Sequence, residues 1–179
     1  MTRQITVGNI KVGGGAPVSI QSMLNTPTTD VEKSLAQIEA LKAAGCQIAR
    51  LAVPDKEAAQ GFARIAEKSP LPLVADIHFD HKLAILAAEG GASKIRINPG
   101  NIGGEENVKA VVDCCKMHAI PIRIGVNGGS LDKKLLEKYG HPTPEALVES
   151  ALQHAAYLEK YGFYDICLSM KSSNVPLMM

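Results

Sequence analysis

Three short apolar segments of this sequence each carry one cation at a position where a strand would place it beside another polar side chain. Side chains of a strand alternate between its two faces, so residues two apart share a face. The pairs are Arg96 with Asn98, Arg123 with Asn127, and Lys171 with Ser169. If these strands are neighbours in a barrel, the cations converge on its interior, where a phosphate would bind.

Two further segments add polar groups in equivalent places, namely Arg50 in one and Asp76 with His78 in the other. A buried cation without a counter-charge is costly. Asp76 is the one carboxylate expected on the inward side, so the cations outnumber it and an anionic ligand is predicted. The planar guanidinium of Arg can form two parallel hydrogen bonds to a phosphate, whereas the ammonium of Lys acts as a point charge. For Asp76 and His78, hydroxyl recognition, proton transfer, metal ligation and a purely structural hydrogen bond of His78 all remain open.

The elements that must position these residues follow a repeating helix-then-strand pattern with clear boundary signals. Thr29 and Glu32 fit a capping box, Asp80 can cap a helix, and Thr143 with Pro144 opens another. The predicted helices cover about 30–44, 56–69, 81–89, 105–117 and 144–161. The predicted strands cover 18–23, 47–51, 71–77, 93–98, 120–126 and 164–171.

Alternating helices and parallel strands define an α/β protein. We predict an incomplete TIM-type (β/α) barrel with about six of eight units, in one domain over residues 1–179. Residues 5–12 read as a β-hairpin that plugs the barrel floor, and the insertion 128–142 carries a short helix over 131–136. A doubly wound sheet is the rival fold, but the first strand-helix turn lacks a dinucleotide-binding glycine fingerprint.

Composition narrows the possible partners. The formal net charge is +1 and no basic block is present, which argues against nucleic acid. No apolar run is long enough for a membrane span and no signal peptide is evident, so we expect a cytoplasmic protein. The cysteines show no metal-binding spacing. Cys46 and Cys167 are expected to pack as small apolar residues, and His118, His141 and His154 to lie on the surface.

Several motifs of the chain together resemble one enzyme family, 4-hydroxy-3-methylbut-2-enyl diphosphate synthase, also called IspG or GcpE. The resemblance extends over nearly the whole chain. The matching segments are Val74-Ala75-Asp76-Ile77-His78-Phe79, Arg96-Ile97-Asn98-Pro99-Gly100-Asn101-Ile102-Gly103, Pro121-Ile122-Arg123-Ile124-Gly125-Val126-Asn127, Gln21-Ser22-Met23, Tyr139-Gly140, Pro142-Thr143-Pro144, and Met170-Lys171-Ser172-Ser173-Asn174-Val175.

The resemblance implies an oxidoreductase of the methylerythritol phosphate pathway of isoprenoid (terpenoid) biosynthesis. Its members reductively open 2-C-methyl-D-erythritol 2,4-cyclodiphosphate with electrons from flavodoxin or ferredoxin. By resemblance, the substrate would be held by Arg50, Asp76, His78, Arg96, Asn98, Arg123, Asn127 and Lys171. No residue of this chain is assigned a catalytic role or a metal.

In the family, the reduction occurs at a 4Fe-4S cluster on a C-terminal domain, which in the bacterial homodimer comes from the other subunit. We expect this chain to be truncated before that domain, to lack the cluster ligands and to be inactive alone. Two alternatives stay open. One is a transferase barrel of the dihydropteroate synthase type, and the other is a non-catalytic module that a partner chain completes.

Overall fold

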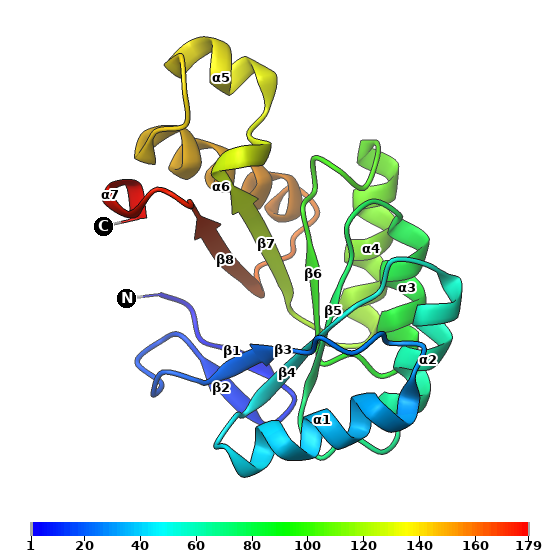
Figure 1. The fold of residues 1–179 in the computed structure, drawn as a ribbon. Coiled ribbons are helices and arrows are strands. Elements are labelled where there is room, and N and C mark those ends of the chain that lie inside the picture. Colours follow the sequence, from blue (N-terminus) through cyan, green and yellow to red (C-terminus); the bar gives the residue numbers. More distant parts are fainter. Residues whose placement is uncertain (1, 179) are drawn as a thin grey trace.

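A computed structural model describes residues 2–178 as a curled sheet of six parallel strands with helices on its outer side (Figure 1). The strands neighbour one another in chain order: β3 (Gln21–Met23), β4 (Ile48–Ala52), β5 (Leu73–Asp76), β6 (Lys94–Ile97), β7 (Ile122–Asn127) and β8 (Ile166–Lys171). Strand β3 and strand β8 form the two edges, and the curl stays open between them. The prediction of an incomplete barrel with six strands is confirmed.

The convex face of the sheet is covered by α1 (Val31–Ala43), α2 (Lys56–Ala66), α3 (His81–Glu89), α4 (Glu105–Met117) and α6 (Pro144–Glu159) (Figure 1). A 3-10 turn η1 (Gly128–Ser130) and the short helix α5 (Lys133–Tyr139) follow the end of β7, and α7 (Val175–Met178) follows the end of β8. Side chains of Asp55, Asp80 and Thr143 accept hydrogen bonds from backbone amides in the first turns of α2, α3 and α6. These caps hold each helix start beside the strand that precedes it.

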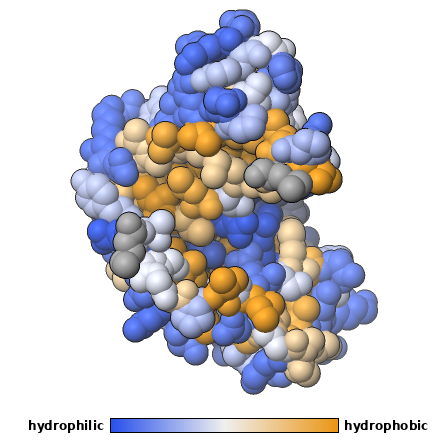
Figure 2. All heavy atoms as spheres, turned by 90° about the vertical axis from the view of Figure 1, so that its left-hand side faces the viewer, coloured by the Kyte–Doolittle hydropathy of each residue, from blue (hydrophilic) through white to orange (hydrophobic). Residues whose placement is uncertain are grey.

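The two faces of the sheet differ in chemistry because strand side chains alternate. On the outer face, Ala75, Ile95 and Ile122 are fully buried in the main core together with Phe62 of α2 and Val112 of α4. The inner face carries the charged and polar residues described below. Figure 2 views the open side of the curl and shows a hollow with hydrophilic atoms inside and apolar atoms around it.

An antiparallel hairpin of β1 (Ile5–Val7) and β2 (Ile10–Val12) closes the lower end of the curl. Its turn lies at Gly8 and Asn9, as predicted, and Gly8 adopts the left-handed φ of +58°. Ile5 and Val7 form a small buried cluster with Ile48 and Val74, which point inward from β4 and β5. The predicted floor plug is therefore present.

Several predicted boundaries were wrong, for identifiable reasons. Strand β5 begins at Leu73 and β7 at Ile122, each directly after a proline that has no N–H for the ladder. Strand β3 begins only at Gln21, since this edge strand has one neighbour and Val18 is 95% exposed.

Two predicted details of the helices also need correction. Helix α1 has no Thr29–Glu32 capping box. Instead, the Asp30 side chain accepts from the amide of Lys33. The helix expected over 131–136 begins at Lys133, because Asp132 accepts from the amide of Lys134 and acts as its cap.

Within residues 2–178, no helix is both long and apolar enough to cross a membrane.

Candidate anion-binding site

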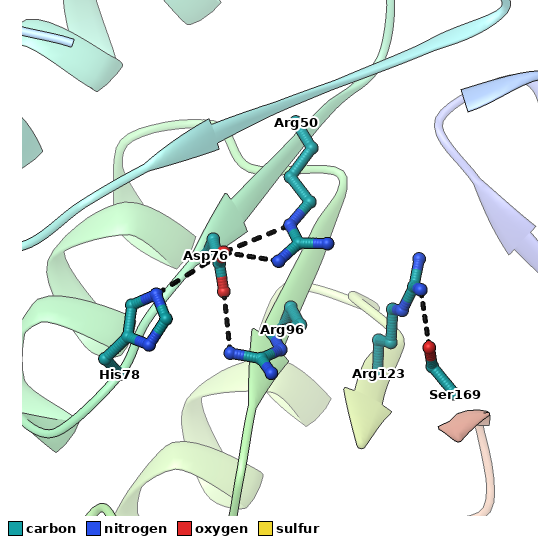
Figure 3. Close-up of polar contacts among 6 residues, drawn as sticks. All are labelled: Arg50, Asp76, His78, Arg96, Arg123 and Ser169. Atoms are coloured by element: carbon teal, nitrogen blue, oxygen red, sulfur yellow. Dashed lines mark hydrogen bonds and ion pairs between the residues drawn. The ribbon is translucent and has the colours of Figure 1, made fainter. Parts of the chain in front are cut away.

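The centre of the site is Asp76, the last residue of β5, whose carboxylate is clamped by two arginines (Figure 3). Arg50 of β4 donates from Nε at 3.1 Å and from Nη2 at 2.5 Å to Oδ2. Arg96 of β6 donates from Nη1 to Oδ1 at 3.0 Å. The Asp76 side chain is only 1% exposed. One buried carboxylate thus fixes two guanidinium groups on neighbouring strands.

His78 lies at the outer margin of this cluster. Its Nε2 is 3.6 Å from Asp76 Oδ2, which is the distance of an ion pair rather than of a hydrogen bond. Its side chain is about half exposed, and its ring lies 5.9 Å from the ring of Phe79. Both oxygens of Asp76 already accept from arginines, so His78 lies beside an ion-paired carboxylate and is not hydrogen-bonded to it.

Arg123 supplies a third guanidinium from β7, and its partner is neutral. Its Nη2 donates to Ser169 Oγ of β8 at 2.6 Å. Burial lowers the pKa of Arg123, nearby Cys167 and Asp76 raise it, and Arg50 and Arg96 lower it. A guanidinium nevertheless stays charged in proteins. Asp76 is already engaged by Arg50 and Arg96 and forms no hydrogen bond with Arg123. The positive charge of Arg123 in the hollow is therefore not balanced by a direct contact with Asp76.

The remaining predicted residues occupy different places. Asn98 is buried, and its Oδ1 accepts from the amide of Gly100 at 3.1 Å, so it shapes the loop after β6. Asn127 and Lys171 are paired across the β7–β8 ladder. Lys171 is exposed at the end of β8, whereas Asn127 is partly buried. The structure thus gathers Arg50, Asp76, His78 and Arg96 into one network and places the others around it.

The predicted site residues do not all lie at the ends of their strands. Asp76, Asn127 and Lys171 end their strands, but Arg123 is the second residue of β7. Arg123 nevertheless pairs in register with Arg96, because successive strands are staggered. The cationic site accordingly covers the inner face of the sheet and is not confined to the strand ends.

Sequence reasoning missed one inward cation, Lys94. It lies two residues before Arg96 on the same face of β6, is 3% exposed, and donates from Nζ to Gln21 Oε1 at 3.2 Å. Burial lowers the pKa of its ammonium, and so do Arg123 and Arg50, while Cys167 raises it. The alternation that singled out Arg96 and Asn98 also includes Lys94 and would have found it.

A separate cavity of about 490 Å³ lies away from the arginines, between the loop after β6 and helices α5 and α6. His154 lines it and is partly buried, so this histidine is less exposed than predicted. Among the residues that the structure describes, its buried Nδ1 has no hydrogen-bond partner. Burial lowers the pKa of the imidazole, while Asp132 raises it. His118 and His141 are exposed, as predicted.

The cysteines do not form a ligand set for an iron-sulfur cluster. Cys46 is buried, with Sγ 3.2 Å from the carbonyl oxygen of Ile48, and Cys167 packs against the hairpin cluster, as predicted for both. Cys114 and Cys115 are buried in α4, and burial raises the pKa of Cys115 to about 12. Within residues 2–178, no three His, Cys, Asp or Glu side chains are placed to hold a metal. The cysteines of the described chain therefore do not fit a 4Fe-4S cluster.

Fold and site together define a (β/α) barrel protein with a cationic inner face built around a single carboxylate. Comparison with known families makes this specific. The model described as the GcpE TIM-barrel domain matches residues 2–179, and the chain belongs to that family.

Curated relatives agree with this assignment. The chain is 61% identical over 178 residues to "4-hydroxy-3-methylbut-2-en-1-yl diphosphate synthase (flavodoxin)" of Clostridium perfringens, covering 99% of this chain and 51% of that protein. It is 59% identical over 177 residues to the protein of the same name from Caldanaerobacter subterraneus subsp. tengcongensis, covering 99% and 50%. The chain therefore spans about half the length of the curated relatives it matches.

Two solved structures with a similar fold are distant from this chain in sequence. Yersinia pestis dihydropteroate synthase gives a TM-score of 0.65 at 12% identity, over 92% of this chain and 61% of that one. Phospho-2-dehydro-3-deoxyheptonate aldolase from Thermotoga maritima gives 0.64 at 15% identity, over 93% and 45%. At such low identities the likeness shows the barrel fold alone.

Proposed function

We propose that this chain is the substrate-binding barrel part of a 4-hydroxy-3-methylbut-2-enyl diphosphate synthase and that its cationic hollow binds the diphosphate of 2-C-methyl-D-erythritol 2,4-cyclodiphosphate. The observation that carries the proposal is the convergence of Arg50, Arg96 and Arg123 on one face of the sheet. Of the three arginines, Arg50 and Arg96 share the carboxylate of Asp76. Family membership and the names of the relatives, which specify the synthesis of a diphosphate, support the proposal.

The arrangement suits a diphosphate for electrostatic reasons. Asp76 occupies three of the N–H donors of Arg50 and Arg96, and each guanidinium has five. The remaining donors are free to bind phosphate oxygens from a fixed direction. Arg123 adds further donors from the next strand. Arginines held in advance lose little side-chain entropy on binding, which favours affinity.

Residues around this centre would complete the contact with substrate. His78 and Lys171, which are exposed, would meet the ligand from the rim of the hollow. Asn127 joins them from the end of β7. Asn98 would contribute by fixing the loop after β6, through its hydrogen bond to Gly100. Their roles in binding are part of the proposal.

The reduction itself would need a 4Fe-4S cluster and an electron donor, flavodoxin or ferredoxin. The names of the relatives, which specify flavodoxin, support flavodoxin as the electron donor. The four cysteines here do not fit the cluster, so we assign this chain the binding step only and derive no redox step from it. A cluster domain in the second half of the protein, a homodimer and a cytoplasmic location belong to the same proposal.

The dihydropteroate synthase alternative is weaker. It also predicts a diphosphate ester in a barrel, but its support is a fold likeness at 12% identity. Titration calorimetry of the purified chain with the cyclodiphosphate and, separately, with a pterin diphosphate distinguishes the two. We expect binding of the cyclodiphosphate. Binding of the pterin diphosphate alone would overturn the proposal.

The third possibility, a non-catalytic module completed by another chain, rests on the two open edges at β3 and β8. Joining this chain to the second half of its Clostridium perfringens relative tests it. We expect the joined protein to reduce the cyclodiphosphate under anaerobic conditions. If it folds and carries a cluster yet shows no activity, the module interpretation gains over the enzyme interpretation.

A further inference from the structure

A buried lysine lies beneath the arginines, and within the part of the chain that the structure describes no carboxylate is at hydrogen-bonding distance from it. Lys94 is 3% exposed, and its Nζ donates to the neutral amide oxygen of Gln21 on β3. Asp76, the buried carboxylate nearby, is engaged by Arg50 and Arg96. Taking an ammonium out of water destabilises the fold unless a counter-charge compensates for it. The fold therefore retains a cation at a net cost to its own stability.

The surroundings of Lys94 increase this cost. Lys94 and Arg96 share a face of β6 and are two residues apart, which is a separation of about 6–7 Å along a strand. Arg123 of β7 and Arg50 of β4 act on Lys94 as like charges, and Cys167 of β8 acts in the opposite sense. Below it, the hairpin residues Ile5 and Val7 close the floor with apolar side chains.

We infer that Lys94 is a positioning residue for the anion, which it attracts through the interior of the protein without touching it. Its burial prevents direct contact with a ligand in the hollow. In a medium of low dielectric constant, however, a charge several ångströms away still contributes strongly to binding. Lys94 adds positive potential under the guanidinium groups and draws the ligand toward the floor. The inference rests on the proposed diphosphate site.

The experiment compares two variants of the chain by titration with inorganic pyrophosphate and by thermal unfolding. Lys94→Met removes the charge but keeps the length of the side chain. Lys68→Met removes one charge from an exposed position after α2 and serves as the matched control. Lys94→Gln is a second variant, for the case that methionine disturbs the fold, and circular dichroism checks each protein.

We expect Lys94→Met to weaken pyrophosphate binding about tenfold or more, because two unit charges about 12 Å apart already contribute that much at an effective dielectric constant near 20. Its melting temperature should be equal to or above that of the wild type, because the cost of burying the charge disappears. Lys68→Met should leave both quantities unchanged.

Other outcomes separate this inference from the proposed function. If the wild type binds pyrophosphate and both Lys94 variants bind it equally well, the inference is overturned and the diphosphate site stands. If the Lys94 variants melt at a lower temperature and bind normally once folded, Lys94 is a structural residue and the inference is wrong. If the wild type itself binds neither pyrophosphate nor the cyclodiphosphate, the proposed site is wrong too.

Discussion

Gly125 of β7 provides the space that the guanidinium of Arg96 occupies. A Cβ atom added to Gly125 would lie 2.6 Å from Nε and 2.6 Å from Nη2 of Arg96. These distances are far below van der Waals contact, so a side chain at this position cannot coexist with the observed Arg96 conformation. The glycine in the strand thus permits the ion pair between Arg96 and Asp76.

Replacing Gly125 with Ala should disturb Arg96 and weaken anion binding. Overpacking of this kind typically destabilises a fold by about 1–3 kcal/mol. Titration with pyrophosphate and thermal unfolding measure the two effects. Gly129→Ala is the control, since a Cβ there meets nothing within 4 Å. If Gly125 acts through Arg96, its substitution should have little further effect on affinity in an Arg96→Ala background.

Replacing Arg123 with Ala should weaken diphosphate binding by about 1.5–3 kcal/mol, the range for hydrogen bonds to charged groups. This corresponds to roughly a ten- to hundredfold rise in Kd. Calorimetry with the cyclodiphosphate measures it, and Arg64→Ala, an exposed arginine of α2, is the control. An unchanged Kd for Arg123→Ala would mean that its bond to Ser169 is merely structural.

Replacing Asp76 with Asn should destabilise the fold, because Arg50 and Arg96 would lose their counter-charge. Breaking a buried pair costs about 3–5 kcal/mol. Pyrophosphate should raise the melting temperature of this variant more than that of the wild type, if its charge replaces the carboxylate. Asp113→Asn, which breaks the exposed pair with Lys109, should change stability little. Equal losses in the two variants would contradict the role given to Asp76.

Acid should destabilise the chain through His154. Burial lowers the pKa of this histidine below its usual 6.5, so the unfolded chain takes up the proton first as the pH falls. The stability present above pH 6.5 is then lost between 6.5 and the lower pKa of the folded state.

Urea unfolding at pH 7.5 and pH 5 measures this loss for the wild type and for His154→Gln. The variant should lose less stability between the two conditions. The exposed His118 provides the control, because His118→Gln should behave like the wild type. A wild type and a His154→Gln variant with the same pH dependence would exclude His154 as the cause.

The sequence predicted the order of helices and strands because each boundary carries a local signal, such as Asp80 before α3 or Thr143 before α6. It predicted the strand starts less well. Hydrogen bonding between strands depends on neighbours that are distant in the chain. Pro72 and Pro121 have no N–H to donate, so β5 and β7 begin one residue after them.

Side-chain partners were harder to predict than positions. Alternation placed Arg50, Arg96 and Arg123 on one face, but the stagger between strands determines which of them reach Asp76. Asn98, expected to reach into the site, instead accepts from the amide of Gly100 in its own loop. Lys94 was overlooked although its position follows the same alternation, and its partner Gln21 lies 73 residues away in the sequence.

The hairpin at the floor has a consequence for how the chain acquires its structure. Its cluster includes Cys167, and Arg3 beside it pairs with Asp165 at 3.0 Å, across a separation of 162 residues. Contacts between such distant residues form slowly, because a long loop must close first. During synthesis, the packing of the hairpin strands β1 and β2 is therefore complete only after β8 has been made.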